Sequence, residues 1–213
     1  MSDSLWYVIP ARKGSKGLKF KNRKLLPITV NQIPQSERDK IIVTTNDEFL
    51  IDYCKSNNIR YRERPASISN DTTSMKSTIQ DVIDFFSLKE SDKVVVLYPT
   101  FPQRTYDDIM SAILFLEKNN LKSCTGKHKL KHHPYLSLEK TSGIFAKRAI
   151  DHTLYRRQDY PECFGLCHIV YVAIASEFKN VDNQLLNKDT GYRWVDDAID
   201  VDYEKDLLQY STS

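Results

Sequence analysis

The residues best suited to chemistry lie in a basic segment that contains glycines, between positions 9 and 22. Glycines such as Gly14 let backbone amides approach a phosphate without a Cβ in the way. Ser15 adds a hydroxyl donor, and Arg12 and Lys21 add positive charge that can follow a triphosphate along its length. The segment matches neither the Walker A pattern nor the dinucleotide-binding fingerprint. These residue types favour an anion-binding loop over a solvated basic turn.

A second candidate site lies near the other end of the chain. Asp200 and Asp202 stand two positions apart, with Val201 between them. If this stretch is a strand, both carboxylates point to the same face while Val201 turns inward. Two oxygen ligands with open positions for water suit Mg²⁺. From the residues alone, a metal site and a polar edge strand are equally good interpretations.

The composition fits one globular domain, which we assign to residues 1–213. Hydrophobic residues make up 40% of the chain and charged residues 28%, so a core can form without a disulfide or metal. No apolar run is long enough to cross a bilayer, and the N-terminus lacks the pattern of a signal peptide. We therefore expect a cytoplasmic protein with no membrane partner and reduced cysteines. The spacing of Cys163, Cys167 and His168 matches no common zinc site.

Positive charge is concentrated in two stretches, although the net charge is only +3. Seven cations and no anion lie between Arg12 and Lys24, and residues 127–133 are also basic. Such a local excess calls for an anionic partner, either a phosphate-rich small molecule or a nucleic acid. The nearly balanced total charge and the lack of a recognisable nucleic-acid module argue against the second, so we expect no nucleic-acid partner.

Strands and amphipathic helices alternate along the chain, which predicts an α/β fold with a mainly parallel sheet covered by helices on both faces. In such sheets ligands bind at the carboxyl ends of the strands. Residues 127–168 are the least regular part and are expected to form an arm. The expected strands are Leu5–Pro10, Lys40–Thr45, Ile59–Arg62, Val94–Tyr98, Lys122–Gly126 and Ile169–Ala175. The expected helices are one capped by Asn46 and running to Asn57, one capped by Asp71 and running to Leu88, one capped by Thr105, and Asp206–Tyr210.

Five segments in order resemble the acylneuraminate cytidylyltransferases, the CMP-sialic acid or nonulosonate synthetase family. The similarity spans about residues 5–210, and five motifs in one order are far more specific than any one of them. The segments are Ala11-Arg12 with Gly14-Ser15-Lys16-Gly17 and Lys21-Asn22; Val43–Glu48; Arg64-Pro65-Ala66 with Asp71–Ser74; Pro99–Thr105; and Ile199–Asp202 with Asp206-Leu207-Leu208.

The resemblance implies a Rossmann-like nucleotidyltransferase fold and a homodimer whose arms, within residues 127–168, complete each other's sugar sites. It implies transfer of CMP from CTP to a nine-carbon 2-keto acid sugar, with Mg²⁺ or Mn²⁺ as cofactor and pyrophosphate as leaving group. Carried over by position, CTP is held by Ala11, Arg12, Gly14, Ser15, Lys21, Asn22, Arg64 and Ser74, and the sugar by Tyr98, Gln103, Arg157 and Tyr171. The catalytic group is Arg12, Lys21, Asp200 and Asp202, with the two aspartates as metal ligands.

Several positions depart from the family pattern, chiefly on the sugar side. Tyr98 stands where the family has a glutamine, Gly165 where it has an arginine, and Cys167-His168 where it has Asn-Gly; Met75 replaces a serine on the nucleotide side. A site built for hydrogen bonds rejects ligands that lack the matching groups. We therefore expect CTP use to be kept and common N-acetylneuraminate to be a poor acceptor. An eight-carbon keto acid or sugar phosphate acceptor, and a degenerate nucleotide-binding subunit, remain the alternatives.

Overall fold

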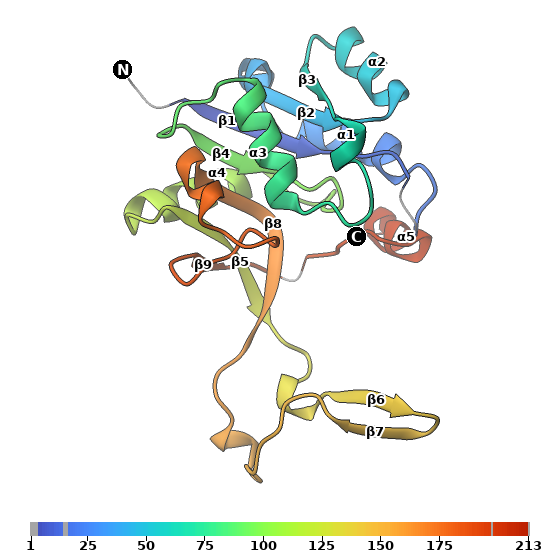
Figure 1. Cartoon of the computed structure of the whole chain (residues 1–213), viewed down its shortest axis with the longest axis vertical. Coiled ribbons are helices and arrows are strands. Elements are labelled where there is room, and N and C mark those ends of the chain that lie inside the picture. Colours follow the sequence, from blue (N-terminus) through green and yellow to red (C-terminus); the bar gives the residue numbers. More distant parts are fainter. Residues whose placement is uncertain (1–3, 15–16, 197, 213) are drawn as a thin grey trace.

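One sheet organises most of the chain. The computed structural model describes residues 4–14, 17–196 and 198–212, the last four of these by backbone alone. Within these residues seven strands form a sheet in the order β3-β2-β1-β4-β8-β5-β9 (Figure 1). These strands are β1 (Leu5–Pro10), β2 (Ile41–Thr45), β3 (Arg60–Glu63), β4 (Lys93–Val96), β5 (Ser123–Lys129), β8 (Phe164–Ile174) and β9 (Gly191–Trp194). The helices are α1 (Lys21–Asn31), α2 (Glu48–Ser56), α3 (Met75–Phe85), α4 (Tyr106–Lys118) and α5 (Glu204–Thr212).

The pairing of the strands confirms a mainly parallel sheet. Strands β3, β2, β1 and β4 are parallel, and β9 is parallel to β5. Only β8, among the described strands of this sheet, runs the other way, and it pairs with both β4 and β5. Its antiparallel direction was not predicted, because an apolar run does not reveal which way its strand will run.

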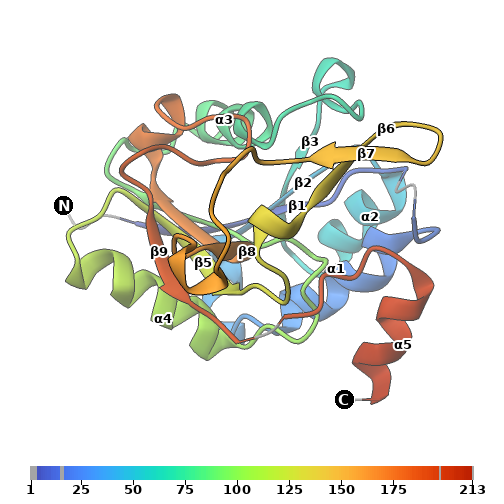
Figure 2. The same cartoon turned by 90° about the horizontal axis from the view of Figure 1, so that it is seen from below.

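Alternating side chains of the strands build a core on each face of the sheet. Tyr7 and Ile9 of β1 pack with α1, α2 and α4, whereas Val8 packs with α3. Figure 2 shows α3 on the opposite side of the sheet from α1 and α4. The expected covering of both faces is therefore confirmed. Among the described residues, no helix has the length and apolar character needed to span a membrane.

Two of the predicted helix caps are wrong, and one is confirmed. Thr105 caps α4 in a full capping box with Asp108, as expected. However, Asp47 rather than Asn46 caps α2, because the Asn46 side chain accepts a hydrogen bond from the Lys13 amide instead. Ser74 rather than Asp71 caps α3, through the backbone amide of Ser77.

An arm leaves the sheet where β5 and β8 extend beyond it (Figure 1). It carries a hairpin of β6 (Leu138–Ser142) and β7 (Phe145–Arg148). Its small interior is aromatic: the Tyr135 ring stacks on His152 at 4.6 Å and lies 5.4 Å from Tyr160. The hairpin falls within the irregular residues 127–168, and the expected role of the arm in a dimer stays a prediction.

Candidate active site

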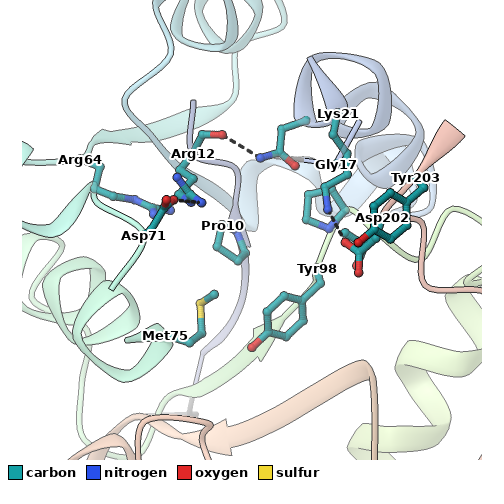
Figure 3. Close-up of a pocket in the computed structure, with 13 residues that line it drawn as sticks. Pro10, Arg12, Gly17, Lys21, Arg64, Asp71, Met75, Tyr98, Asp202 and Tyr203 are labelled. Atoms are coloured by element: carbon teal, nitrogen blue, oxygen red, sulfur yellow. Dashed lines mark hydrogen bonds and ion pairs between the residues drawn. The ribbon is translucent and has the colours of Figure 1, made fainter. Parts of the chain in front are cut away.

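A cleft of about 550 Å³ opens at the carboxyl ends of β1, β3 and β4. This is the edge at which open parallel sheets bind ligands. Figure 3 shows Arg12, Arg64 and Asp71 on one side of it, with Lys21 and Asp202 on the other. The lining residues are Pro10, Arg12, Gly17, Lys21, Asn22, Arg64, Asp71, Met75, Tyr98, Pro99, Thr100, Asp202 and Tyr203.

The basic loop leaves β1 on a backbone that is fixed at several points. The Ala11 amide donates to the Thr44 carbonyl at 2.9 Å, and Thr45 Oγ1 donates to the Ala11 carbonyl at 2.6 Å. The Asn22 side chain donates to the Arg12 carbonyl at 2.8 Å, which ties the start of α1 to the loop. Ala11 and Asn22 therefore shape the loop through its backbone. Gly14 has a φ of 85°, which favours glycine.

The predicted serine of this loop, Ser15, lies outside the described residues. The loop borders a second hollow of about 430 Å³, which shares Arg12, Lys21 and Asn22 with the cleft. Further cations line this hollow, among them Lys13, Lys19 and Arg23. The positive surface therefore continues beyond the cleft, as a chain of phosphates requires.

Two cations of the cleft form ion pairs with carboxylates of the same cleft. Arg12 Nη2 lies 2.5 Å from Asp71 Oδ1, and Lys21 Nζ lies 2.7 Å from Asp202 Oδ1. Both pairs are partly solvent-exposed, so they are weak and can be exchanged for a more highly charged ligand. A phosphate can thus take the place of either carboxylate.

Arg64 is the buried cation of the cleft. It is 6% exposed, and its guanidinium donates to the Thr44 hydroxyl and carbonyl. Burial, together with the positive charge of Arg12, lowers the pKa of Arg64 to about 10. The side chain is still a cation at neutral pH, and its desolvation strengthens its attraction for an anion.

The acidic segment, residues 199–202, does not form the strand that its alternation allowed. It joins no sheet; instead the Val201 amide donates to the Thr100 carbonyl at 2.8 Å. Val201 is fully buried against Leu18 and Leu25, so the expected inward turn of this residue is confirmed. Asp200 and Asp202 flank it.

Both aspartates are exposed, yet partial desolvation raises the pKa of Asp200. A hydrogen bond with Thr100 and the charge of Lys21 act in the opposite direction, and the like charge of Asp202 adds to the rise. These interactions place both carboxylates within each other's electrostatic reach, beside the basic loop.

The donor set fits a hard divalent cation that shares its ligands with a triphosphate. Within the described residues, no cluster of three His, Cys, Asp or Glu side chains is arranged to hold a metal without help. Asp200 and Asp202 supply two carboxylates, and Mg²⁺ characteristically completes its shell with phosphate oxygens and water. The two aspartates therefore fit Mg²⁺ once a nucleotide is bound, and the metal assignment stays a prediction.

Gly17 couples the basic loop to the acidic segment, and Gly17→Ala should disrupt both. A Cβ at Gly17 would overlap the backbone carbonyl oxygen of Asp202. Because backbone cannot swing aside, we expect a stability loss of about 1–3 kcal/mol and a clear drop in activity. Thermal melts and CTP kinetics test this. Ser56→Ala, at the exposed end of α2, is the control that should leave CTP kinetics unchanged.

The predicted sugar-site residues do not gather in one place. Tyr98 lines the cleft, but Arg157 is an exposed residue of the arm, between β7 and β8, and does not line the cleft. The Gln103 side chain donates to the Ile199 carbonyl at 3.1 Å, so it tethers the acidic segment. Tyr171 is completely buried in the core, which argues against contact with a sugar.

Ser74, expected to hold CTP, caps α3 beside the cleft, and its neighbour Met75 lines the cleft. Asp71 lines the cleft. Its position in the sequence assigns it to a family-like segment and predicts a helix cap, but indicates no role in the site. No spacing rule could have found its ion pair with Arg12, because the two residues meet only in the folded sheet.

The family is decided by a match across most of the chain. A family model described as cytidylyltransferase matches residues 6–162, from β1 through most of the arm. The chain belongs to the cytidylyltransferase family. This confirms the resemblance seen in the ordered motifs.

Curated members of the family show the same similarity. The N-acylneuraminate cytidylyltransferase of Escherichia coli is 34% identical over 113 residues, covering 50% of this chain and 26% of that protein. The N-acylneuraminate cytidylyltransferase of Streptococcus agalactiae is 21% identical over 212 residues, covering 94% of this chain. The chain spans about half the length of the Streptococcus protein, 51%.

A solved structure confirms the Rossmann-like nucleotidyltransferase fold of this cytidylyltransferase-family chain. The CMP:2-keto-3-deoxy-manno-octonic acid synthetase, solved in complex with CTP, superposes with a TM-score of 0.68. The alignment covers 99% of this chain and 98% of that one at 13% sequence identity. At this identity the likeness shows the fold alone.

Proposed function

We propose that this chain transfers CMP from CTP to a nonulosonic, sialic-acid-like 2-keto acid sugar and releases pyrophosphate. The observation that carries the proposal is the single cleft that joins three cations, Arg12, Lys21 and Arg64, to the acidic segment with Asp202. The three cations are suited to bind a triphosphate. The acidic segment is suited to bind a divalent cation that also contacts those phosphates. Membership of the cytidylyltransferase family supports cytosine as the base.

The reaction in this proposal is attack by the anomeric hydroxyl of the sugar on the α-phosphate of CTP. Arg12 and Lys21 exchange their carboxylate partners for phosphate oxygens and offset charge on the departing pyrophosphate. Asp200 and Asp202 hold Mg²⁺, which supplies charge neutralisation at the phosphates when it is bound. No side chain is assigned as a general base, so catalysis rests on positioning and charge.

The residues assigned to the acceptor differ from the family pattern more than the residues assigned to CTP do. Tyr98 lines the cleft with an aromatic ring where the family has a glutamine. No arginine can take the place of Gly165 without rearrangement, because a Cβ there would overlap the His128 ring. A carboxylate-binding arginine is thus missing at that position. These features support a modified nonulosonate rather than N-acetylneuraminate as the preferred acceptor.

Turnover with a panel of acceptors tests this preference. We expect pyrophosphate release from CTP and Mg²⁺ with modified nonulosonates, and about tenfold lower kcat/KM with N-acetylneuraminate. Eight-carbon keto acids and sugar phosphates complete the panel. N-acetylneuraminate as the best acceptor would refute the preference, and a better eight-carbon acid would replace the nine-carbon assignment. CTP binding without turnover of any acceptor would favour the degenerate subunit.

The arm supports a homodimer, because it exposes apolar side chains and carries Arg157, which does not line the cleft of its own subunit. Ile144 is 94% exposed, Phe145 66% and Tyr155 94%. Ile144 and Phe145 are adjacent in the hairpin, and exposed apolar side chains that lie together mark an interaction surface. In this proposal the arm packs on a second copy and offers Arg157 to that copy's sugar.

Sedimentation tests the assembly. We expect a dimer at micromolar concentration, weakened by Ile144→Asp together with Phe145→Asp in the hairpin, with a matching loss of activity. Leu114→Asp, at a leucine that is 57% exposed on α4, is the control. A fully active monomer would contradict the arm's role.

A further inference from the structure

His168, which lies outside the cleft lining, contacts the ring of the cleft residue Tyr98. The two ring centroids lie 5.7 Å apart with planes tilted by 35°. His168 belongs to β8, the strand next to β4, and Tyr98 follows β4 by two residues. The Tyr98 ring, which lines the cleft, therefore packs against the His168 ring, which does not line it.

The His168 ring is itself held from two directions. Its Nδ1 lies 3.1 Å from the hydroxyl of Thr125, a residue that is 2% exposed. The Thr125 hydroxyl donates to the Cys167 carbonyl, so its oxygen is free to accept from His168 Nδ1–H. On another side His168 lies edge-on to the fully buried Tyr171, at 6.4 Å. The His168 ring is thus held between Thr125 and Tyr171.

The backbone on which Tyr98 sits is fixed beside the same strand. Arg104 is buried, and its Nη1 donates to the Tyr98 carbonyl at 3.1 Å and the Ile169 carbonyl at 2.8 Å. One guanidinium therefore binds the main chain of Tyr98 to the residue after His168. With the backbone clamped in this way, the orientation of the Tyr98 ring depends on what its faces touch.

We propose that His168 is a positioning residue that fixes the Tyr98 ring at the acceptor end of the cleft and so sets which acceptor binds. The inference rests on the proposed function, because it assumes that the acceptor lies against Tyr98. A ring in van der Waals contact with a bound sugar excludes or admits substituents by its position, and a shift of about 1 Å at a site of this kind can cost about a hundredfold in rate.

Two variants separate the ring of His168 from its hydrogen bond. His168→Phe keeps a ring against Tyr98 but loses the bond to Thr125, whereas His168→Asn can keep that bond but has no ring. We expect His168→Asn to raise the KM for the acceptor about tenfold and to leave the KM for CTP within about twofold. His168→Phe should stay close to wild type. Phe86→Ala, which removes a ring contact with Phe85 at the far end of α3 from Met75, is the control and should change neither constant.

A double variant tests whether His168 acts through Tyr98. In a Tyr98→Ala background, His168→Asn should have almost no further effect, because the ring that it positions is gone. Full additivity, equal rises in both KM values, or loss in His168→Phe alone would overturn the proposal. If the wild type turns over no keto acid, the proposed function fails separately. Crystal structures then decide the positioning role: a displaced Tyr98 ring in His168→Asn upholds it, and an unmoved ring overturns it.

Discussion

Asparagine at position 200 or 202 should lower CMP transfer by about a hundredfold or more while the protein stays folded. Asparagine keeps the size of aspartate but loses the charge that a divalent cation requires. Asp202 is exposed, and the carboxylate of Asp200 is destabilised by its surroundings, so neither change removes an interaction that the fold needs. Steady-state rates across a Mg²⁺ titration, with melting temperatures, measure the effect.

Asp52→Asn provides the matched control for this pair. Asp52 forms an exposed ion pair with Lys55 on α2, away from the cleft, so its loss should leave transfer unchanged. Near wild-type rates in both Asp200→Asn and Asp202→Asn would remove the metal assignment. The stretch around Asp200 and Asp202 would then be a solvent-exposed polar edge, which is the other interpretation that the sequence allowed.

Lys21→Ala should weaken CTP use far more than it weakens the fold. We expect kcat/KM for CTP to fall about a hundredfold, because a charge that stabilises the departing pyrophosphate is lost. The Lys21 side chain is 13% exposed, which is more buried than a loop cation would suggest, and its partner Asp202 is 58% exposed. Loss of such a half-exposed pair costs only about 1 kcal/mol of stability.

Lys24→Ala separates the role of Lys21 from general charge. Lys24 is exposed on the same helix, α1, one turn further along, and should change CTP kinetics by less than about twofold. Normal turnover of CTP by Lys21→Ala would exclude the triphosphate role. Tight, salt-sensitive binding of DNA in place of CTP would instead revive the nucleic-acid interpretation.

Where a local pattern determined structure, the sequence predicted it well. The apolar run Leu5–Pro10 is β1 with the expected bounds, and Thr105 with Asp108 forms the capping box of α4. The inward turn of Val201 was also correct, although no strand forms there. Its amide donates to the Thr100 carbonyl instead of to a neighbouring strand, so Val201 is buried without belonging to a sheet.

Where a long-range partner determined structure, the sequence could not predict it. Asn46 and Asp71 both have the right chemistry to cap a helix, yet Lys13 and Arg12 bind them instead. Tyr171 has the right residue type for a sugar contact, but the antiparallel pairing of β8 with β4 turns it into the core. Many residues of the cleft could thus be predicted from the sequence, but the role of each could be predicted only in part.

Pyrophosphate release from each of the four nucleoside triphosphates, with Mg²⁺ and the best keto-acid acceptor, tests the central claim most directly. We predict release that requires both CTP and the acceptor, together with a product whose mass equals the acceptor plus CMP less water. Equal release from several triphosphates, or release from another triphosphate but not from CTP, would contradict the assignment of this cleft to cytidylyl transfer.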